Sequence, residues 1–205
     1  MSRSIRIIPH GAGNIGSLMD LFHQIGHFPH VAESPGQLKS ADIAVLPGVG
    51  ASGSAMKRLD ESGFSDALKD MHARQRPLIG ICVGAQVLFE HLEEDDCTGL
   101  GLIRGDVTRI AGGAFNNGWC DVNLQGRRVG EQPMLLKSSA KTFFFNHGYQ
   151  INTCVAMDEL GVTSPDAKLL AYFLHKNLCG IQFHPEKSQA AGLAFIGNAM
   201  KHYGL

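Results

Sequence analysis

The sequence has few of the features that place a chain at a membrane, on nucleic acid or in a disulfide-stabilised scaffold. Its 205 residues carry a formal net charge of only −1, so no excess of positive charge is available to bind nucleic acid or an anionic membrane. No apolar run is long enough to cross a bilayer, and the N-terminus lacks the apolar core of a signal peptide. The five cysteines include no C-x-x-C pair and are odd in number, which disfavours a zinc knuckle or a disulfide framework. These absences predict a soluble, cytoplasmic protein.

What is present fits one packed α/β domain spanning residues 1–205. Hydrophobic residues make up 44% of the chain, enough for a full core at this length. In the first half, short apolar runs that predict buried parallel strands occupy 4–8, 28–32, 42–46 and 77–81. Segments with helical spacing occupy 14–26, 53–73 and 85–92.

The pattern changes after residue 99. Short alternating runs predict antiparallel strands at 105–110, 118–124, 142–145 and 168–174. Lys176 and Asn177 separate two apolar runs in the manner of a hairpin, and a last helix is predicted over 189–203. The predicted fold is therefore a single-domain α/β fold with a mixed, largely parallel sheet flanked by helices.

A glycine-rich loop, GAGNIG, follows the first apolar run. Residues 11–16 spell G-x-G-x-x-G before a helix, and Glu33 closes the next apolar run about twenty residues later. This is the written form of a dinucleotide-binding site and keeps a Rossmann-type oxidoreductase open as an alternative. The same glycines also allow a tight turn and close helix packing without any nucleotide, and the motif alone is weak.

The stretch GICVG, residues 80–84, joins a strand to a helix and matches the cysteine form of a nucleophile elbow. Side chains at Gly80 and Gly84 would crowd such a sharp turn. The turn places the Cys82 sulfur near a helix N-terminus, where the helix dipole favours a thiolate, and it brings the Val83 N–H close to a developing oxyanion. A buried cysteine of no catalytic importance fits G-x-C-x-G alone about equally well.

A second strand ends at His184-Pro185-Glu186, one hundred residues further on. His184 is suited to accept the proton of a cysteine and return it to a leaving group, and Glu186 to hold the imidazole by its other nitrogen. A strand-end histidine by itself is more often structural. Together with the elbow, these residues form a set of nucleophile, base and orienting carboxylate.

At these residues the chain resembles the class I (triad) glutamine amidotransferases, which have a flavodoxin-like fold. GICVGAQ and GIQFHPEKS carry the resemblance to the family. PGVGASGSAM, GLGLI, NNGWCDV and HPEKS resemble its branch of glutaminase subunits of imidazole glycerol phosphate synthase. The resemblance covers almost the whole chain. It implies hydrolysis of L-glutamine through a glutamyl thioester, without a metal or organic cofactor, and transfer of ammonia to a (β/α)₈ cyclase of histidine biosynthesis.

The resemblance also implies residue roles. Cys82 would be the nucleophile, His184 the general acid/base and Glu186 the orienting carboxylate, and the oxyanion hole would be formed by backbone N–H groups of Val49, Gly50 and Val83. The residues expected to contact glutamine are Gly48, Gln86, Asn146, His147, Gly148 and Tyr149. Those expected at the partner interface are Asn14, Trp119 and Lys187, with the glycine loop facing the partner.

Three short stretches depart from the pattern of that branch. Asn146-His147-Gly148 replaces a His-Ser-Tyr or His-Thr-Tyr group and resembles the small subunit of carbamoyl phosphate synthetase. Cys120 stands where Gly-Trp-Asn is usual, and Pro9-His10 replaces an acid or tyrosine before the glycine loop. The departures leave the triad intact and bear on the identity of the partner and ammonia acceptor.

Other interpretations remain open. A glutaminase that feeds a surface-sugar amidation enzyme has the same chemistry with another acceptor, and a catalytically idle regulatory subunit is a third possibility beside the oxidoreductase. A metal site at His23, His27 and His30 is disfavoured because Gly26 ends the helix between the first two. The acidic run 93–96 is interpreted as a solvated loop.

Overall fold

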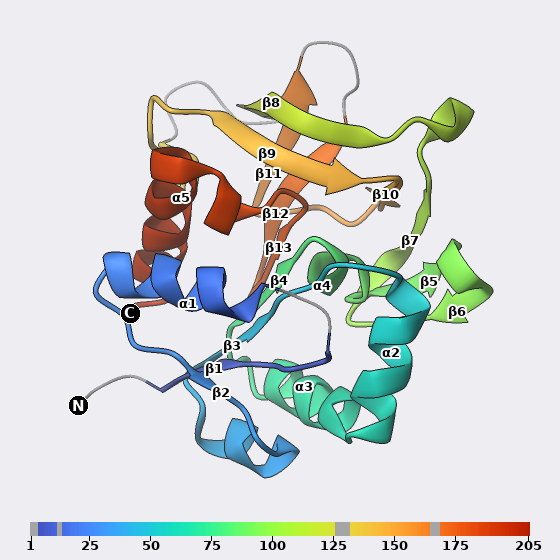
Figure 1. The fold of residues 1–205 in the computed structure, drawn as a ribbon, viewed down its shortest axis with the longest axis vertical. Coiled ribbons are helices and arrows are strands. Elements are labelled where there is room, and N and C mark those ends of the chain that lie inside the picture. Colours follow the sequence, from blue (N-terminus) through green and yellow to red (C-terminus); the bar gives the residue numbers. More distant parts are fainter. Residues whose placement is uncertain (1–3, 12–13, 126–131, 165–168) are drawn as a thin grey trace.

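The computed structural model describes residues 4–11, 14–125, 132–164 and 169–205. Ala12 and Gly13 of the glycine-rich loop, and the first residue of the strand predicted over 168–174, lie outside these ranges. Within them, nine strands form the main sheet in the order β2-β1-β3-β4-β13-β12-β11-β8-β9 (Figure 1). The chain therefore has the α/β fold with a mixed sheet that the sequence predicts.

One side of the sheet is parallel. Its strands are β1 (Ile5–Ile7), β2 (His30–Val31), β3 (Ile43–Leu46), β4 (Leu78–Ile81) and β13 (Leu178–Ile181). The side chains of β3, β4 and β13 are all buried, as expected for strands that are covered on both faces. α1 (Ile15–Gln24) and α5 (Gln189–His202) pack on one side of these strands, and α2 (Ser52–Glu61) and α3 (Phe64–Ala73) lie on the other (Figure 1).

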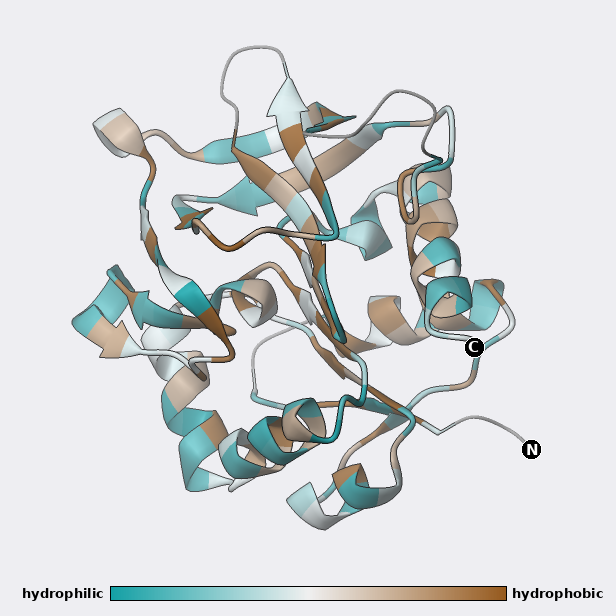
Figure 2. Ribbon diagram, turned by 180° about the vertical axis from the view of Figure 1, so that it is seen from behind, coloured by the Kyte–Doolittle hydropathy of each residue, from teal (hydrophilic) through white to brown (hydrophobic). Residues whose placement is uncertain are grey.

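The other side of the sheet is antiparallel. It consists of β8 (Asn116–Leu124), β9 (Thr142–His147), β11 (Glu159–Ser164) and β12 (Leu170–His175). β12 and β13 form the predicted hairpin, and Lys176 in its turn has a φ of +54°. Figure 2 shows that the strands through the middle of the molecule are largely hydrophobic, and this is where the buried core lies.

A second, smaller sheet was not predicted. Its strand order is β10-β7-β5-β6, with β5 (Phe89–Leu92), β6 (Cys97–Thr98), β7 (Ile103–Arg109) and β10 (Tyr149–Asn152). The predicted helix over 85–92 is therefore wrong, because α4 covers only Val83–Gln86 and β5 follows. Leu88, Phe89 and Leu92 have helical spacing, but pairing of β5 with β7 settles the conformation.

The predicted helix over 53–73 is also wrong in one respect. Gly63, with a φ of +76°, separates α2 from α3. A left-handed glycine ends one helix and re-aims the next, so that both helices turn an apolar face to the sheet. In the ranges that the structure describes, no helix is long and apolar enough to cross a membrane.

Candidate active site

The elbow after β4 has the strained geometry that the sequence predicts. Cys82 has φ 54° and ψ −111°, a conformation that side chains rarely adopt, and it directly precedes α4. A Cβ on Gly84 would lie 1.8 Å from the carbonyl oxygen of Leu46, and one on Gly80 would lie 2.4 Å from the oxygen of Gly84. Both positions therefore require glycine, which is the physical reason for G-x-C-x-G.

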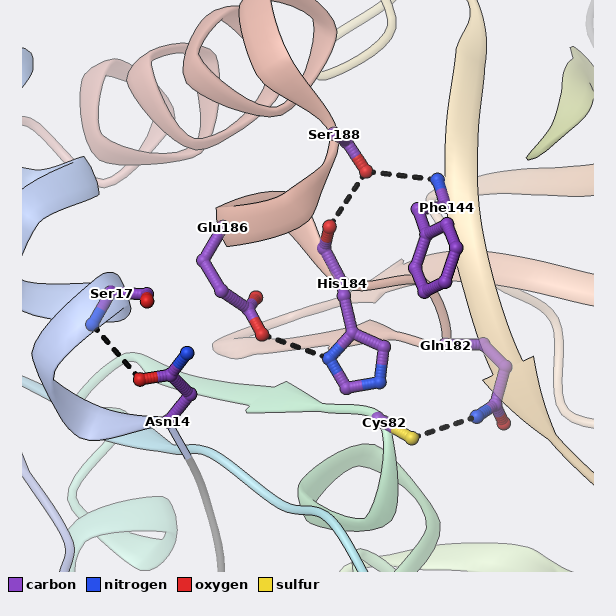
Figure 3. A network of polar contacts seen from close by, with 8 residues as sticks. All are labelled: Asn14, Ser17, Cys82, Phe144, Gln182, His184, Glu186 and Ser188. Carbon is purple, nitrogen blue, oxygen red and sulfur yellow. Dashed lines mark hydrogen bonds and ion pairs between the residues drawn. The ribbon is translucent and has the colours of Figure 1, made fainter. Parts of the chain in front are cut away.

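The histidine and glutamate come from the neighbouring strand. β13 pairs with β4 in parallel register, with Ile181 opposite Ile81, so the chain segments that follow both strands emerge at the same edge of the sheet. His184 is 1% exposed, and its Nδ1 lies 2.9 Å from Glu186 Oε1 (Figure 3). Pairing of the two strands thus brings together residues that are one hundred positions apart.

The second ring nitrogen of His184 is free for chemistry. Nε2 has no hydrogen-bond partner among the described residues, and Figure 3 shows it on the side of the ring that faces the Cys82 sulfur. Burial by itself would lower the pKa of His184, but Cys82 and Glu186 outweigh this effect and raise it to about 9. A histidine that is readily protonated beside a cysteine suits a thiolate–imidazolium pair.

Ser188, which the sequence analysis did not single out, holds this loop against the sheet. Its buried hydroxyl donates to the His184 carbonyl at 2.6 Å and accepts the Phe144 N–H at 3.0 Å (Figure 3). The His184 N–H in turn donates to the Phe144 carbonyl at 2.8 Å. The loop that carries His184 is therefore tied to β9 through both the N–H and the carbonyl of Phe144.

A cavity of about 240 Å³ opens beside Cys82. It is lined by Val49, Gly50, Cys82, Val83, Gln86, Glu94, Phe115, Asn146, His147, Gly148 and Tyr149. The cavity thus brings together every residue expected to contact glutamine or form the oxyanion hole except Gly48. Gly48 instead packs behind the elbow, where a Cβ would lie 2.6 Å from the Gly84 nitrogen.

Two residues of the cavity wall were missed by the sequence analysis. Glu94 belongs to the run interpreted as a solvated loop, yet it lines the cavity and its carboxylate accepts the Ser52 N–H at 2.8 Å, at the start of α2. Phe115 is 61% exposed and lies against Gly148. Neither residue has a sequence motif that could have revealed its position, because Glu94 lies in a single 3₁₀ turn and Phe115 in a loop.

Two of the departures from the family pattern meet in the structure. Cys120 Sγ donates to Asn116 Oδ1 at 3.4 Å, and Asn116 Nδ2 lies 3.1 Å from His147 Nε2. His147 Nδ1 lies 2.6 Å from the Tyr149 carbonyl oxygen, so Nδ1 carries the proton and Nε2 accepts from Asn116. Burial lowers the pKa of His147 to about 4, which keeps this ring neutral.

The third departure lies beside Pro47, just before the residues expected to form part of the oxyanion hole. His10 is buried, and its Nε2 donates to the carbonyl of Pro47, directly before Gly48. Burial lowers the pKa of His10 and outweighs the contact with Pro47, which by itself would raise it. Beyond it, Gly50 reaches the cavity with a φ of +91°.

The three residues expected at a partner interface are exposed. Lys187 Nζ lies 5.5 Å from the centre of the Phe144 ring, and Trp119 packs edge-on against the same ring at 5.8 Å. Asn14 lies at the start of α1, where its side chain accepts the Ser17 N–H at 3.2 Å. Trp119 is 49% exposed, an unusually large apolar surface for a tryptophan.

The described residues contain no group of three or more His, Cys, Asp or Glu side chains placed to hold a metal ion. His23 instead contacts the ring of Phe28, at 5.4 Å between ring centres.

A cysteine on a strained elbow, with a histidine and glutamate from the adjacent parallel strand, defines the class of α/β enzymes that use a cysteine nucleophile. Within that class, the family model "Glutamine amidotransferase class-I" matches residues 16–201. The chain belongs to this family of glutamine amidotransferases, as the sequence motifs predict.

Relatives and solved structures agree with this placement. The chain is 34% identical to imidazole glycerol phosphate synthase subunit HisH of Sulfurimonas denitrificans, over 98% of this chain and 99% of the relative. It is also 34% identical to subunit HisH of Bacillus subtilis, over 94% and 93%. A chain of the PurLQS structure from Thermotoga maritima shares the fold, with a TM-score of 0.75, 16% identity and coverage of 98% and 99%.

Proposed function

We propose that residues 1–205 act as one glutamine amidotransferase domain, the glutaminase subunit of an imidazole glycerol phosphate synthase in histidine biosynthesis. The observation that carries this proposal is the opening of Cys82, with His184 and Glu186 behind it, onto a cavity of about 240 Å³. The names of the relatives indicate the pathway, because the HisH subunits match nearly the whole chain.

The geometry suits hydrolysis of an amide in two steps. The Cys82 sulfur attacks the side-chain carbonyl carbon of L-glutamine, and its proton passes to His184 Nε2 and then to the departing ammonia. Water attacks the resulting thioester, His184 takes its proton, and that proton returns to the sulfur as glutamate leaves. Glu186 holds Nδ1 throughout, which keeps Nε2 directed at the reacting atoms.

The cavity wall offers suitable partners for the rest of the substrate. Val83 follows the nucleophile at the start of α4, and its N–H and those of Val49 and Gly50 are the donors we assign to the oxyanion. Glu94 offers a carboxylate for the α-ammonium group, and the exposed Asn146 an amide for the α-carboxylate. Gly48 then acts by packing against the elbow rather than by touching glutamine.

The ammonia needs an acceptor enzyme, and we propose the (β/α)₈ cyclase subunit of the same synthase as the partner. Trp119 and Lys187, which surround Phe144, and Asn14 at the start of α1 are the exposed residues we assign to that interface. The five free cysteines fit a reducing compartment, and we assign the complex to the cytoplasm.

The test is to combine the chain with the cyclase and follow synthesis from glutamine and from added ammonium salt. Cys82→Ala should abolish the glutamine-dependent reaction and leave the ammonium-dependent reaction intact. Loss of both reactions would place part of the acceptor site on this chain and contradict the proposed division of labour. If the wild-type chain feeds ammonia to a sugar-amidating enzyme but not to the cyclase, the proposed acceptor is wrong and the proposed glutaminase chemistry stands.

A further inference from the structure

One buried side chain contacts the Cys82 sulfur without having any assigned role. Gln182 lies between the end of β13 and His184 and is 0% exposed. Its Nε2 lies 3.8 Å from Cys82 Sγ, a contact drawn in Figure 3, and its Oε1 accepts from Gln86 Nε2 at 3.1 Å. Gln86 lines the cavity, so a chain of two amides runs from the cavity wall to the nucleophile.

The direction of this chain of hydrogen bonds follows from the chemistry of sulfur. A thiolate has no proton to give, so the amide end that faces it must be the N–H₂ group. Gln182 Oε1 then points away from the sulfur and needs a donor, which Gln86 provides. Each amide therefore donates toward Cys82, and the dipole of each amide has its positive end on that side.

We infer that Gln182 is a catalytic residue that stabilises the Cys82 thiolate by donating its amide N–H to the sulfur, with Gln86 fixing the orientation of that amide. The inference rests on the proposed function of Cys82 as nucleophile. A hydrogen bond to a charged acceptor is stronger than a neutral one, and the buried amide would otherwise leave a donor unpaired. The backbone N–H of Gln182 donates to the Ala171 carbonyl at 2.8 Å, which anchors the residue to β12.

The other groups around the sulfur have different roles. His184 faces Cys82 from the β13 side and supplies positive charge when protonated, and Glu186 acts through it. His147 on β9 stays neutral, and Glu94 brings a negative charge to the cavity wall. Gln182 thus differs from these side chains in offering the thiolate a hydrogen bond without carrying or changing a charge.

The experiment measures how fast iodoacetamide alkylates Cys82 as the pH is varied, with mass mapping to separate it from the other cysteines. Gln182→Met keeps a similar volume and removes the donor. It should lower the alkylation rate near neutral pH about tenfold and move the midpoint of the profile to higher pH. Gln182→Glu keeps the shape and places a negative charge beside the sulfur, so its shift should be larger.

The control is Gln24→Met, the same chemical change at the exposed end of α1, which should leave the profile unchanged. An unchanged profile in a folded Gln182→Met variant overturns the inference. Should that variant fail to fold, the isosteric Gln182→Glu carries the test, and a profile that stays in place overturns the inference equally.

Alkylation needs neither glutamine nor a partner, so it separates the inference from the proposed function. If Gln182→Met shifts the profile but the wild-type chain never hydrolyses glutamine, the proposed function is refuted and the role of Gln182 is supported. If the wild-type chain hydrolyses glutamine but Gln182→Met leaves the profile in place, the proposed function is supported and the role of Gln182 is refuted.

Discussion

The two halves of the main sheet contribute different things to the candidate site. The parallel half supplies Cys82 after β4 and His184 and Glu186 after β13, from adjacent strands in register. The antiparallel half supplies the cavity wall at Asn146 and His147 on β9, together with the exposed Trp119 on β8. The proposed catalytic side chains follow strands of the parallel half, whereas the antiparallel half supplies part of the cavity wall and one of the three residues expected at the partner interface.

The halves also differ in how tightly they constrain the sequence. In the parallel half, backbone atoms fill the space around Gly80 and Gly84, so little can change. The antiparallel half carries two of the three departures from the family pattern, and the Asn116 side chain joins them. Chemistry that depends on backbone packing resists substitution, whereas a wall built of side chains adapts by exchanging hydrogen-bond partners.

The largest effect is expected when one methyl group is added at the elbow of the parallel half, because it should destabilise the fold there. Gly84→Ala places a Cβ 1.8 Å from the Leu46 carbonyl oxygen, so the backbone must shift, and we expect the free energy of unfolding to fall by about 3 kcal/mol. Gly197→Ala on α5 is the control. A Cβ there has open space, and helix propensity predicts a gain of roughly 0.5–1 kcal/mol. Urea unfolding measures both, and equal stability of Gly84→Ala and wild type would refute the steric argument.

A change at the orienting carboxylate tests the chemistry of the same half while keeping its shape. Glu186→Gln removes the charge that holds the His184 Nδ1 proton, so the ring loses its preferred tautomer. We expect kcat for glutamine hydrolysis to fall at least about a hundredfold. Ammonium-dependent synthesis by the complex serves as the control and should persist. A Glu186→Gln variant with wild-type kcat would remove Glu186 from the mechanism.

The antiparallel half is probed through the buried neutral ring of His147. Because its pKa in the folded chain is about 4, the unfolded chain binds more protons between pH 4 and pH 6.5. The free energy of unfolding should therefore fall as the pH is lowered through this window, with about 2 kcal/mol due to His147. His147→Gln should flatten that part of the curve, whereas replacement of the exposed His202 by Gln should not. The same slope in His147→Gln and wild type would contradict the assignment.

The smallest expected effect lies at the proposed docking surface. Trp119→Ala should weaken binding to the cyclase about tenfold, because a half-exposed tryptophan beside Phe144 and Lys187 has the character of an interface anchor. Phe28, 69% exposed just before β2 at the opposite edge of the sheet, gives the control Phe28→Ala, which should bind like wild type. Calorimetric titration measures the affinity of both variants for the cyclase. An equal loss of affinity in Trp119→Ala and Phe28→Ala would contradict the assignment of Trp119 to the docking surface.

The motifs of the sequence were sufficient to predict the fold class, the family and the composition of the candidate triad. These predictions succeeded because the patterns are short. The strained turn is encoded within five consecutive residues by Gly80, Cys82 and Gly84, and His184 and Glu186 lie two positions apart. Each group is a short pattern of neighbouring residues, so it can be recognised in the sequence alone, whereas the contact between the two groups depends on the pairing of β4 with β13.

Tertiary structure decided what depends on pairing between distant segments. β5 became a strand because β7 lies beside it, although its apolar spacing equally fits a helix. Glu94 lines the cavity from a 3₁₀ turn and Phe115 from a loop. Ser188 hydrogen-bonds to Phe144, forty-four positions away, and Gln182 contacts Cys82, one hundred positions away. Side chains with no periodicity or motif of their own take their role from whatever the fold places against them, and only the folded chain shows which neighbours those are.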